Sequence, residues 1–154
     1  MSFHILIDSD HAGDKVTRRS QTGVLIFINK APILWFSKKK NSVQTSTFGS
    51  EFTAMNQAVE MTQAICYKLR IFGIRLTGPT IVYGGNKSVY KNFSIPESVL
   101  NKKHHSVYYH ACRESVSSEL IRFAKEGTMT NLADLFTNIM PKVFRKRILD
   151  MLMS

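Results

Sequence analysis

The chain has 154 residues and a formal net charge of +10 at pH 7, from 21 lysines and arginines against 11 aspartates and glutamates. Its length suits one domain with its own core, and no stretch of about eighteen residues lacks a charged side chain, which excludes a membrane-spanning helix. The excess of positive charge favours a polyanionic partner.

The N-terminus and the cysteines bear on location. Met1 to His4 lack a basic region followed by an apolar run, so we expect no signal peptide. Cys66 and Cys112 both fall in predicted helices, where free thiols in a reducing compartment are the expected state. These features predict an intracellular protein, in the cytoplasm or the nucleus.

Apolar stretches at the start of the chain predict strands joined as an antiparallel meander. The first ends at Asp8-Ser9-Asp10, and Asn29-Lys30 makes a tight connection between the second and the third. The segments 11–21 and 37–45 are polar and basic, and we expect them to be loops. The predicted strands are residues 3–7, 22–28 and 32–36.

A long amphipathic helix follows, from about Thr47 to Phe72, with Ser46 or Thr47 as its N-cap and Gly73 closing it. Its apolar residues recur mostly three or four positions apart, the spacing of one buried helix face. Glu51 lies in the first turn at the edge of that face, where a lone carboxylate is costly to bury. It therefore needs a metal ion, a basic side chain or open water.

The rest of the chain alternates between strands and helices. The predicted elements are strands at 80–83 and 120–124, helices at 87–92 and 101–116, and a last helix that begins at 131–136. Because helical crossovers return the chain in the same direction, the two later strands add to the sheet in parallel. The sequence thus predicts an α/β domain with a five-stranded mixed sheet, three antiparallel strands and then two parallel ones, flanked by helices.

Three carboxylates are predicted to meet at one edge of this sheet. Asp8 ends the first strand, Glu51 begins the long helix and Asp134 lies in the last helix; ligand sites of open α/β sheets lie outside the strand ends. Grouped carboxylates repel one another unless divalent cations neutralise them. Two such cations about 4 Å apart are an established device for cleaving a phosphodiester by in-line attack of water.

Each acid also has an ordinary interpretation. Asp8 suits a turn, Glu51 suits a solvated first turn favoured by the helix dipole, and Asp134 suits a first-turn charge behind an Asn131 cap. A zinc site is disfavoured, because zinc ligands usually come as two close pairs and only one cluster exists. Its members are His104, His105, His110 and Cys112.

Four segments in chain order carry a family resemblance. They are Asp8-Ser9-Asp10-His11-Ala12-Gly13-Asp14 with Arg18-Arg19-Ser20 and Thr22-Gly23; Ser37-Lys38-Lys39 with Ser46-Thr47 and Glu51-Phe52; Val82-Tyr83-Gly84-Gly85-Asn86; and Lys103-His104-His105 with His110, Arg113-Glu114 and Asn131-Leu132-Ala133-Asp134-Leu135-Phe136-Thr137. From about Phe3 to Pro141, the chain resembles the ribonuclease H (RNase H) domain of Ty1/copia-type retrotransposon Pol polyproteins.

The resemblance implies an RNase H-like fold over residues 1–141, with 142–154 as a basic C-terminal end or tail. It implies Mg²⁺-dependent (or Mn²⁺-dependent) hydrolysis of the RNA strand of RNA–DNA hybrids at a two-metal site. Asp8, Glu51 and Asp134 match three of the four metal-binding acids of that family. Gly85 stands at the fourth, so we expect a weakly active or inactive enzyme. Asp10 is a possible accessory ligand, and His105 matches a family histidine without an assigned role.

The alternative is a catalytically dead remnant that still binds nucleic acid, and a third hypothesis is a structural remnant that binds nothing. The expected partners are an RNA–DNA hybrid and an upstream reverse transcriptase domain, with location in a cytoplasmic virus-like particle or the nucleus. Basic and polar side chains are expected to track phosphates, although solvated surface charge is the default for such runs. They are Arg18, Arg19, Lys38, Lys39, Lys40, Asn86, Lys102 and Lys103.

Overall fold

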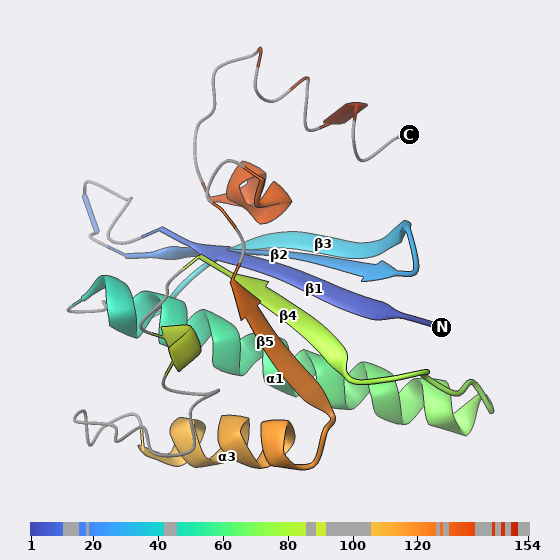
Figure 1. Cartoon of the computed structure of the whole chain (residues 1–154). Helices are drawn as coiled ribbons and strands as arrows, with labels where there is room; N and C mark the ends of the chain where they lie inside the picture. The colour runs from blue at the N-terminus through green and yellow to red at the C-terminus, as the bar shows by residue number, and fades with distance from the viewer. Residues whose placement is uncertain are drawn as a thin grey trace.

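The computed structural model describes residues 1–10, 16–17, 19–41, 46–85, 89–91, 106–125, 127, 130–137, 143, 146 and 149–150. The predicted strands form one five-stranded sheet in the order β3-β2-β1-β4-β5 (Figure 1). Strands β1, β2 and β3 pair antiparallel, and β4 and β5 add in parallel on the other side of β1, which confirms the predicted α/β class. Their bounds are β1 Phe3–Ser9, β2 Gln21–Ile28, β3 Ala31–Lys39, β4 Thr80–Gly84 and β5 Ile121–Lys125.

The β2–β3 connection is the tight turn expected at Asn29-Lys30. Asn29 has a φ of 55°, a left-handed conformation that asparagine tolerates better than most residues. Its side-chain oxygen accepts a hydrogen bond from the Ser2 amide at 2.9 Å, so the turn also fastens the start of β1. The hairpin and the central strand are therefore held in one register.

Helix α1 (Thr47–Ile71) supports one face of the sheet. Ser46 is its N-cap and accepts a hydrogen bond from the Gly49 amide at 3.1 Å, while Gly73 follows its C-cap with a φ of 73°. The core lies between α1 and the sheet, where Ile5, Phe52 and Met55 are each 0% exposed. The predicted bounds of this helix are confirmed.

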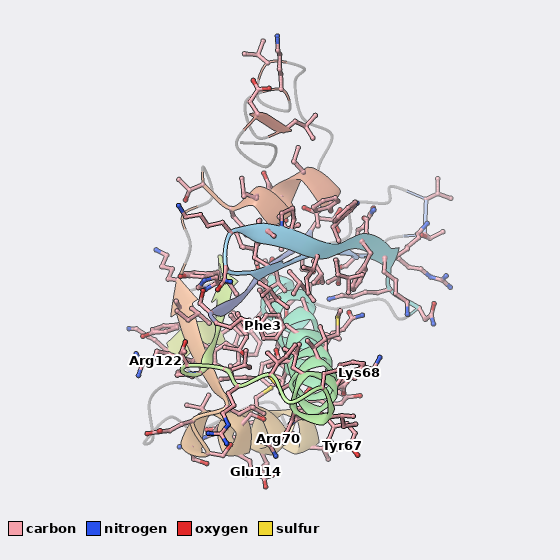
Figure 2. The ribbon with its side chains drawn as sticks, turned by 90° about the vertical axis from the view of Figure 1, so that its right-hand side faces the viewer. Phe3, Tyr67, Lys68, Arg70, Glu114 and Arg122 are labelled. Carbon is pink, nitrogen blue, oxygen red and sulfur yellow. The ribbon has the colours of Figure 1, made fainter. Side chains whose placement is uncertain are left out.

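Helix α3 (Ser106–Ser117) lies on the same side of the sheet as α1 and leads into β5 (Figure 1). The Gln63 side-chain amide donates to the Ser115 hydroxyl at 3.0 Å and links the two helices. Figure 2 faces the C-terminal end of α1: Tyr67 projects there, whereas Phe3 lies inside the molecule. No helix among the described residues is long and apolar enough to cross a bilayer.

Three details differ from the sequence-based expectation. β3 runs to Lys39, so Lys38 and Lys39 belong to a strand and not to a loop; an edge strand tolerates exposed lysines. Glu51 is the fifth residue of α1 and not in its first turn. The predicted last helix is, over the described part, the five-residue 3-10 helix η2 (Leu132–Phe136). The structure also describes helical backbone at 89–91 and from Ser106 onward, while 101–105 lie outside the described residues.

Candidate functional site

Asp8 is the penultimate residue of the central strand β1. The Thr137 hydroxyl donates a hydrogen bond to its Oδ2 atom. Burial raises the pKa of the Asp8 carboxyl, the Thr137 hydrogen bond opposes this, and the adjacent Asp134 carboxylate raises the pKa further. Two of the three predicted acids are thus neighbours whose charges disfavour each other.

Asp134 reaches this place through η2 and the residue that caps it. The Asn131 side-chain oxygen accepts from the Ala133 amide at 3.1 Å, which confirms the predicted cap. The Asn131 amide nitrogen donates at 2.9 Å to the Ile7 carbonyl on β1, beside Asp8. Because Asn131 is 3% exposed, this bond is shielded from water and holds η2 to the end of the central strand.

Gly23 allows η2 to lie this close to the sheet. It pairs with Asp8 across the β1–β2 ladder, and a Cβ atom on it would lie 2.6 Å from the Ala133 carbonyl oxygen. No Cβ approaches a backbone oxygen so closely, so a larger residue would push η2 away. Because Gly23 has no side chain, η2 can pack against β2, and this packing positions Asp134.

Glu51 is the third acid, and it is buried. The side chain is 8% exposed, and its Oε2 atom has no hydrogen-bond partner among the described residues. Its pKa is raised from 4.5 to about 7, first by burial and then by the Asp8 charge, while Lys40 opposes the shift. The interpretation of Glu51 as a solvated first-turn carboxylate is wrong.

Lys40 points into this region. Its ammonium group donates to the Ser50 carbonyl and, at 3.3 Å, to the Ser9 hydroxyl, so it bridges the start of α1 to the end of β1. Burial lowers the pKa of Lys40 to about 8, although the charges of Glu51 and Asp10 raise it. Desolvation thus outweighs attraction for both Lys40 and Glu51. Lys40 was expected on a phosphate-binding surface, and its inward position was not predicted.

Gly85 directly follows β4. The last paired residues of β1 and β4 are Leu6 and Tyr83, and two further residues along each strand bring Gly85 level with Asp8. A Cβ atom on Gly85 would meet nothing within 4 Å, and its φ lies outside the left-handed range, so the backbone accepts an aspartate. At Gly84, by contrast, a Cβ would collide with the Met55 methyl group.

Asp10 and the predicted nucleic-acid-binding residues other than Lys40 lie in different parts of the chain. Asp10 lies beyond β1, and its Oδ1 atom accepts from the Gln21 amide at 2.6 Å, a bond that joins the end of β1 to the start of β2. Lys38, Lys39 and Arg19 are exposed. Some predicted residues lie outside the described part of the chain, namely Arg18, Asn86, Lys102, Lys103 and His105.

Among the described residues, no three His, Cys, Asp or Glu side chains are arranged to hold a metal ion as they stand. The cluster formed by Asp8, Glu51 and Asp134 nevertheless suits a bound cation better than it suits water. The Asp134 charge raises the pKa of Asp8, the Asp8 charge raises the pKa of Glu51, and Glu51 keeps a buried oxygen without a partner in the described structure. Both features are unfavourable for the protein alone and are relieved by a positive ion.

Sequence reasoning did not identify the residues that position the acids: Lys40, Gly23, the Asn131 bond to β1, and Thr137 as a partner of Asp8. Gly23, Asn131 and Thr137 carried a signal, because each belongs to a segment of the family resemblance, whereas Lys40 carried none. Their positioning roles depend on contacts between residues far apart in the chain, which no local pattern contains.

No protein-family model matches the chain. It is 33% identical over 137 residues to the retrovirus-related Pol polyprotein from transposon RE1 of Arabidopsis thaliana, covering 89% of this chain and 9% of that protein. The Pol polyprotein from transposon RE2 of the same plant is 30% identical over 143 residues, 93% of this chain and 10% of that protein. This chain is homologous to a segment of copia-type Pol polyproteins.

The chain spans about a tenth of the length of these relatives. Among solved structures, LC11-RNase H1 in complex with an RNA/DNA hybrid has a TM-score of 0.67 at 15% identity, covering 89% of this chain and 94% of that one. A foamy viral protease-reverse transcriptase in complex with RNA/DNA hybrid has a TM-score of 0.63 at 14% identity, covering 88% of this chain and 19% of that one. The fold is therefore RNase H-like, as the resemblance implied.

Proposed function

We propose that this copia-type, RNase H-like domain binds RNA–DNA hybrids and hydrolyses their RNA strand weakly, because Gly85 replaces one acid of its metal site. The observation that carries the proposal is the meeting of Asp8, Asp134 and a buried, partly unpartnered Glu51 at the end of the central strand. The homologous polyproteins and the hybrid-bound structural neighbours support it.

Asp8, Glu51 and Asp134 are the residues that would hold Mg²⁺ or Mn²⁺. A divalent cation bound by them would make water more acidic and offset the negative charge that develops on the phosphate. The protein's own part is to orient the oxygens: Thr137 fixes the Asp8 carboxylate, and Lys40 holds the first turns of α1, and with them Glu51, against β1.

Gly85 favours the second candidate function, a nucleic-acid-binding domain without catalysis. Glycine has no side-chain oxygen, so the position level with Asp8 contributes neither a ligand nor a negative charge. By analogy with the loss of one group that stabilises a transition state, we expect a rate about 10²–10⁴ below that of an intact site. Hybrid binding depends mostly on the phosphate backbone and survives this change.

The test is cleavage of an end-labelled RNA–DNA hybrid with Mg²⁺ and with Mn²⁺, comparing the natural chain with Gly85→Asp. The space at Gly85 admits the Cβ atom of the new side chain, since it would meet nothing within 4 Å. Gly85→Asn is the matched control, since it has nearly the same shape without the charge. We expect Gly85→Asp alone to cut about 10²–10⁴ faster than the natural chain. Equal cutting by all three proteins would overturn the role given to Gly85.

The larger assembly is part of the same proposal. The structural neighbour from foamy virus is a protease-reverse transcriptase, of which the matching part is 19%. We propose that this domain acts with a reverse transcriptase on the same polyprotein and receives the hybrid which that enzyme makes, in a cytoplasmic particle or the nucleus.

A further inference from the structure

A second polar site lies on the flank of the molecule, in a cleft of about 440 Å³ between β3 and α1. Side chains from β2, the end of β3, α1 and α3 line this cleft. They include Thr22, Lys38, Asn41, Asn56, Glu60 and Tyr108. Lys40 borders both the cleft and the acidic cluster. The volume suits a small polar ligand of nucleotide size.

The two ends of the cleft differ in charge. Lys38 and Lys40 are two residues apart along an extended segment, so their side chains leave it on the same side. Farther along, the Asn56 side-chain amide donates to a Glu60 carboxylate oxygen at 2.9 Å. This bond fixes the carboxylate on the α1 wall, about 10 Å along the helix from Thr53 at the other end of the wall. The cleft is therefore cationic at one end and acidic at the other.

Two buried polar groups, one on β2 and one on α1, show that the cleft is lined for polar contacts. Thr22 is 1% exposed and lies opposite Lys38 in the β2–β3 ladder, and its hydroxyl oxygen has no hydrogen-bond partner among the described residues. Asn56 is 6% exposed and has both ends of its amide engaged, by Glu60 and by the Cys112 thiol. A buried hydroxyl without a partner is unfavourable unless a bound group or water satisfies it.

We infer that this cleft binds one nucleotide of single-stranded nucleic acid, with the phosphate at the Lys38 end and the base at the Glu60 end. A phosphate forms charge-assisted hydrogen bonds with lysine. A carboxylate accepts from the exocyclic amino group of cytosine, and a tyrosine ring provides a surface on which any base stacks. Uracil lacks that amino group, so the cleft prefers cytosine to uracil.

This inference does not depend on hydrolysis, and its test needs neither a hybrid nor a metal. The ¹⁵N-labelled full chain is titrated in EDTA with cytidine monophosphate, with uridine monophosphate and with inorganic phosphate, and amide shifts are followed by NMR. We expect shifts at the end of β3 and along residues 53–60 of α1. We expect cytidine monophosphate to bind about tenfold more tightly than uridine monophosphate. Shifts elsewhere alone, or phosphate binding as tightly as cytidine monophosphate, would overturn the inference.

Matched variants separate the cleft from general electrostatics. Lys38→Met is expected to weaken cytidine monophosphate binding about tenfold, whereas Lys30→Met, an exposed lysine in the β2–β3 turn, leaves it unchanged. Glu60→Gln is expected to remove the preference for cytosine while keeping uridine monophosphate binding. If Lys38→Met and Lys30→Met weaken cytidine monophosphate binding equally, net charge alone explains the effect, and this result would contradict the proposed site. The NMR spectra themselves report whether each variant is folded.

Discussion

At the scale of single residues, the fold brings together charges that are unfavourable without a ligand. Asp8 and Glu51 both have raised pKa values because burial removes water from their carboxylates, and each is also near another acid. Lys40 compensates in part, but its own pKa falls to about 8 on burial. Such opposed shifts are typical of functional sites, where the geometry serves a ligand and not the free protein.

The raised pKa of Glu51 predicts how stability changes with pH in EDTA. The folded state holds the Glu51 proton up to about pH 7, whereas the unfolded chain releases it near 4.5, so folded molecules bind more protons between these values. The free energy of unfolding therefore falls as pH rises through this window, by at most about 3 kcal/mol. Urea unfolding at pH 4.5 and pH 8 measures the loss, which we expect to be smaller in Glu51→Gln, where the raised pKa of Asp8 still contributes.

The control for this prediction is Glu114→Gln, which changes an exposed glutamate on α3 and is expected to keep the pH dependence of the natural chain. Excess Mg²⁺ provides a second check. A cation that binds the ionised carboxylates stabilises the folded state at pH 8 more than at pH 4.5. If the natural chain and the Glu51→Gln variant lose stability equally as the pH rises, groups other than Glu51 cause the effect.

At the scale of elements, the sequence predicted most of the sheet but did not predict the contacts that hold η2 against it. The positions of the five strands and the caps of α1 were predicted because alternation, spacing and cap residues are local signals. The charges of Lys38 and Lys39 indicated a loop, yet an edge strand accommodates them. The contact of η2 with β1 depends on the bond from Asn131 to Ile7, more than a hundred positions away, so only tertiary structure reveals it.

The packing of η2 on β2 makes Gly23 a sensitive position. Gly23→Ala places a Cβ atom 2.6 Å from the Ala133 carbonyl oxygen and 2.8 Å from the Phe136 Cβ, both of which are parts of the chain that cannot simply rotate away. We expect a loss of about 1–3 kcal/mol in the free energy of unfolding, as for other overpacked sites. Urea denaturation measures it, together with weaker cleavage by the Gly85→Asp protein carrying the same change.

The matched control is Gly78→Ala, because a Cβ at Gly78 meets nothing within 4 Å and this glycine has no left-handed φ. We expect it to change the free energy of unfolding by less than about 0.5 kcal/mol. Similar losses for the two variants would mean that η2 does not depend on the close approach at Gly23, and that Asp134 is held there by other contacts.

At the scale of the whole molecule, the charge of +10 and the acidic cluster act on the same ligand in opposite ways. The carboxylates of Asp8, Glu51 and Asp134 repel a phosphate, so binding of a polyanion needs cations around the cluster. Lys39 is one candidate: it is exposed at the end of β3, opposite Gln21, whose amide holds Asp10. Lys68 is exposed near the far end of α1, about 25 Å along the helix from Glu51.

This arrangement predicts a local dependence of hybrid binding on salt. The logarithm of the binding constant falls linearly with the logarithm of salt concentration, by about 0.9 for each phosphate that a duplex contact neutralises. We expect Lys39→Met to reduce the steepness of that line by about one phosphate and Lys68→Met to leave it unchanged, as measured by fluorescence anisotropy between low and physiological salt. Equal reductions would show that the net charge attracts the hybrid without a defined path. An unchanged slope in both variants would place the phosphate contacts on other residues.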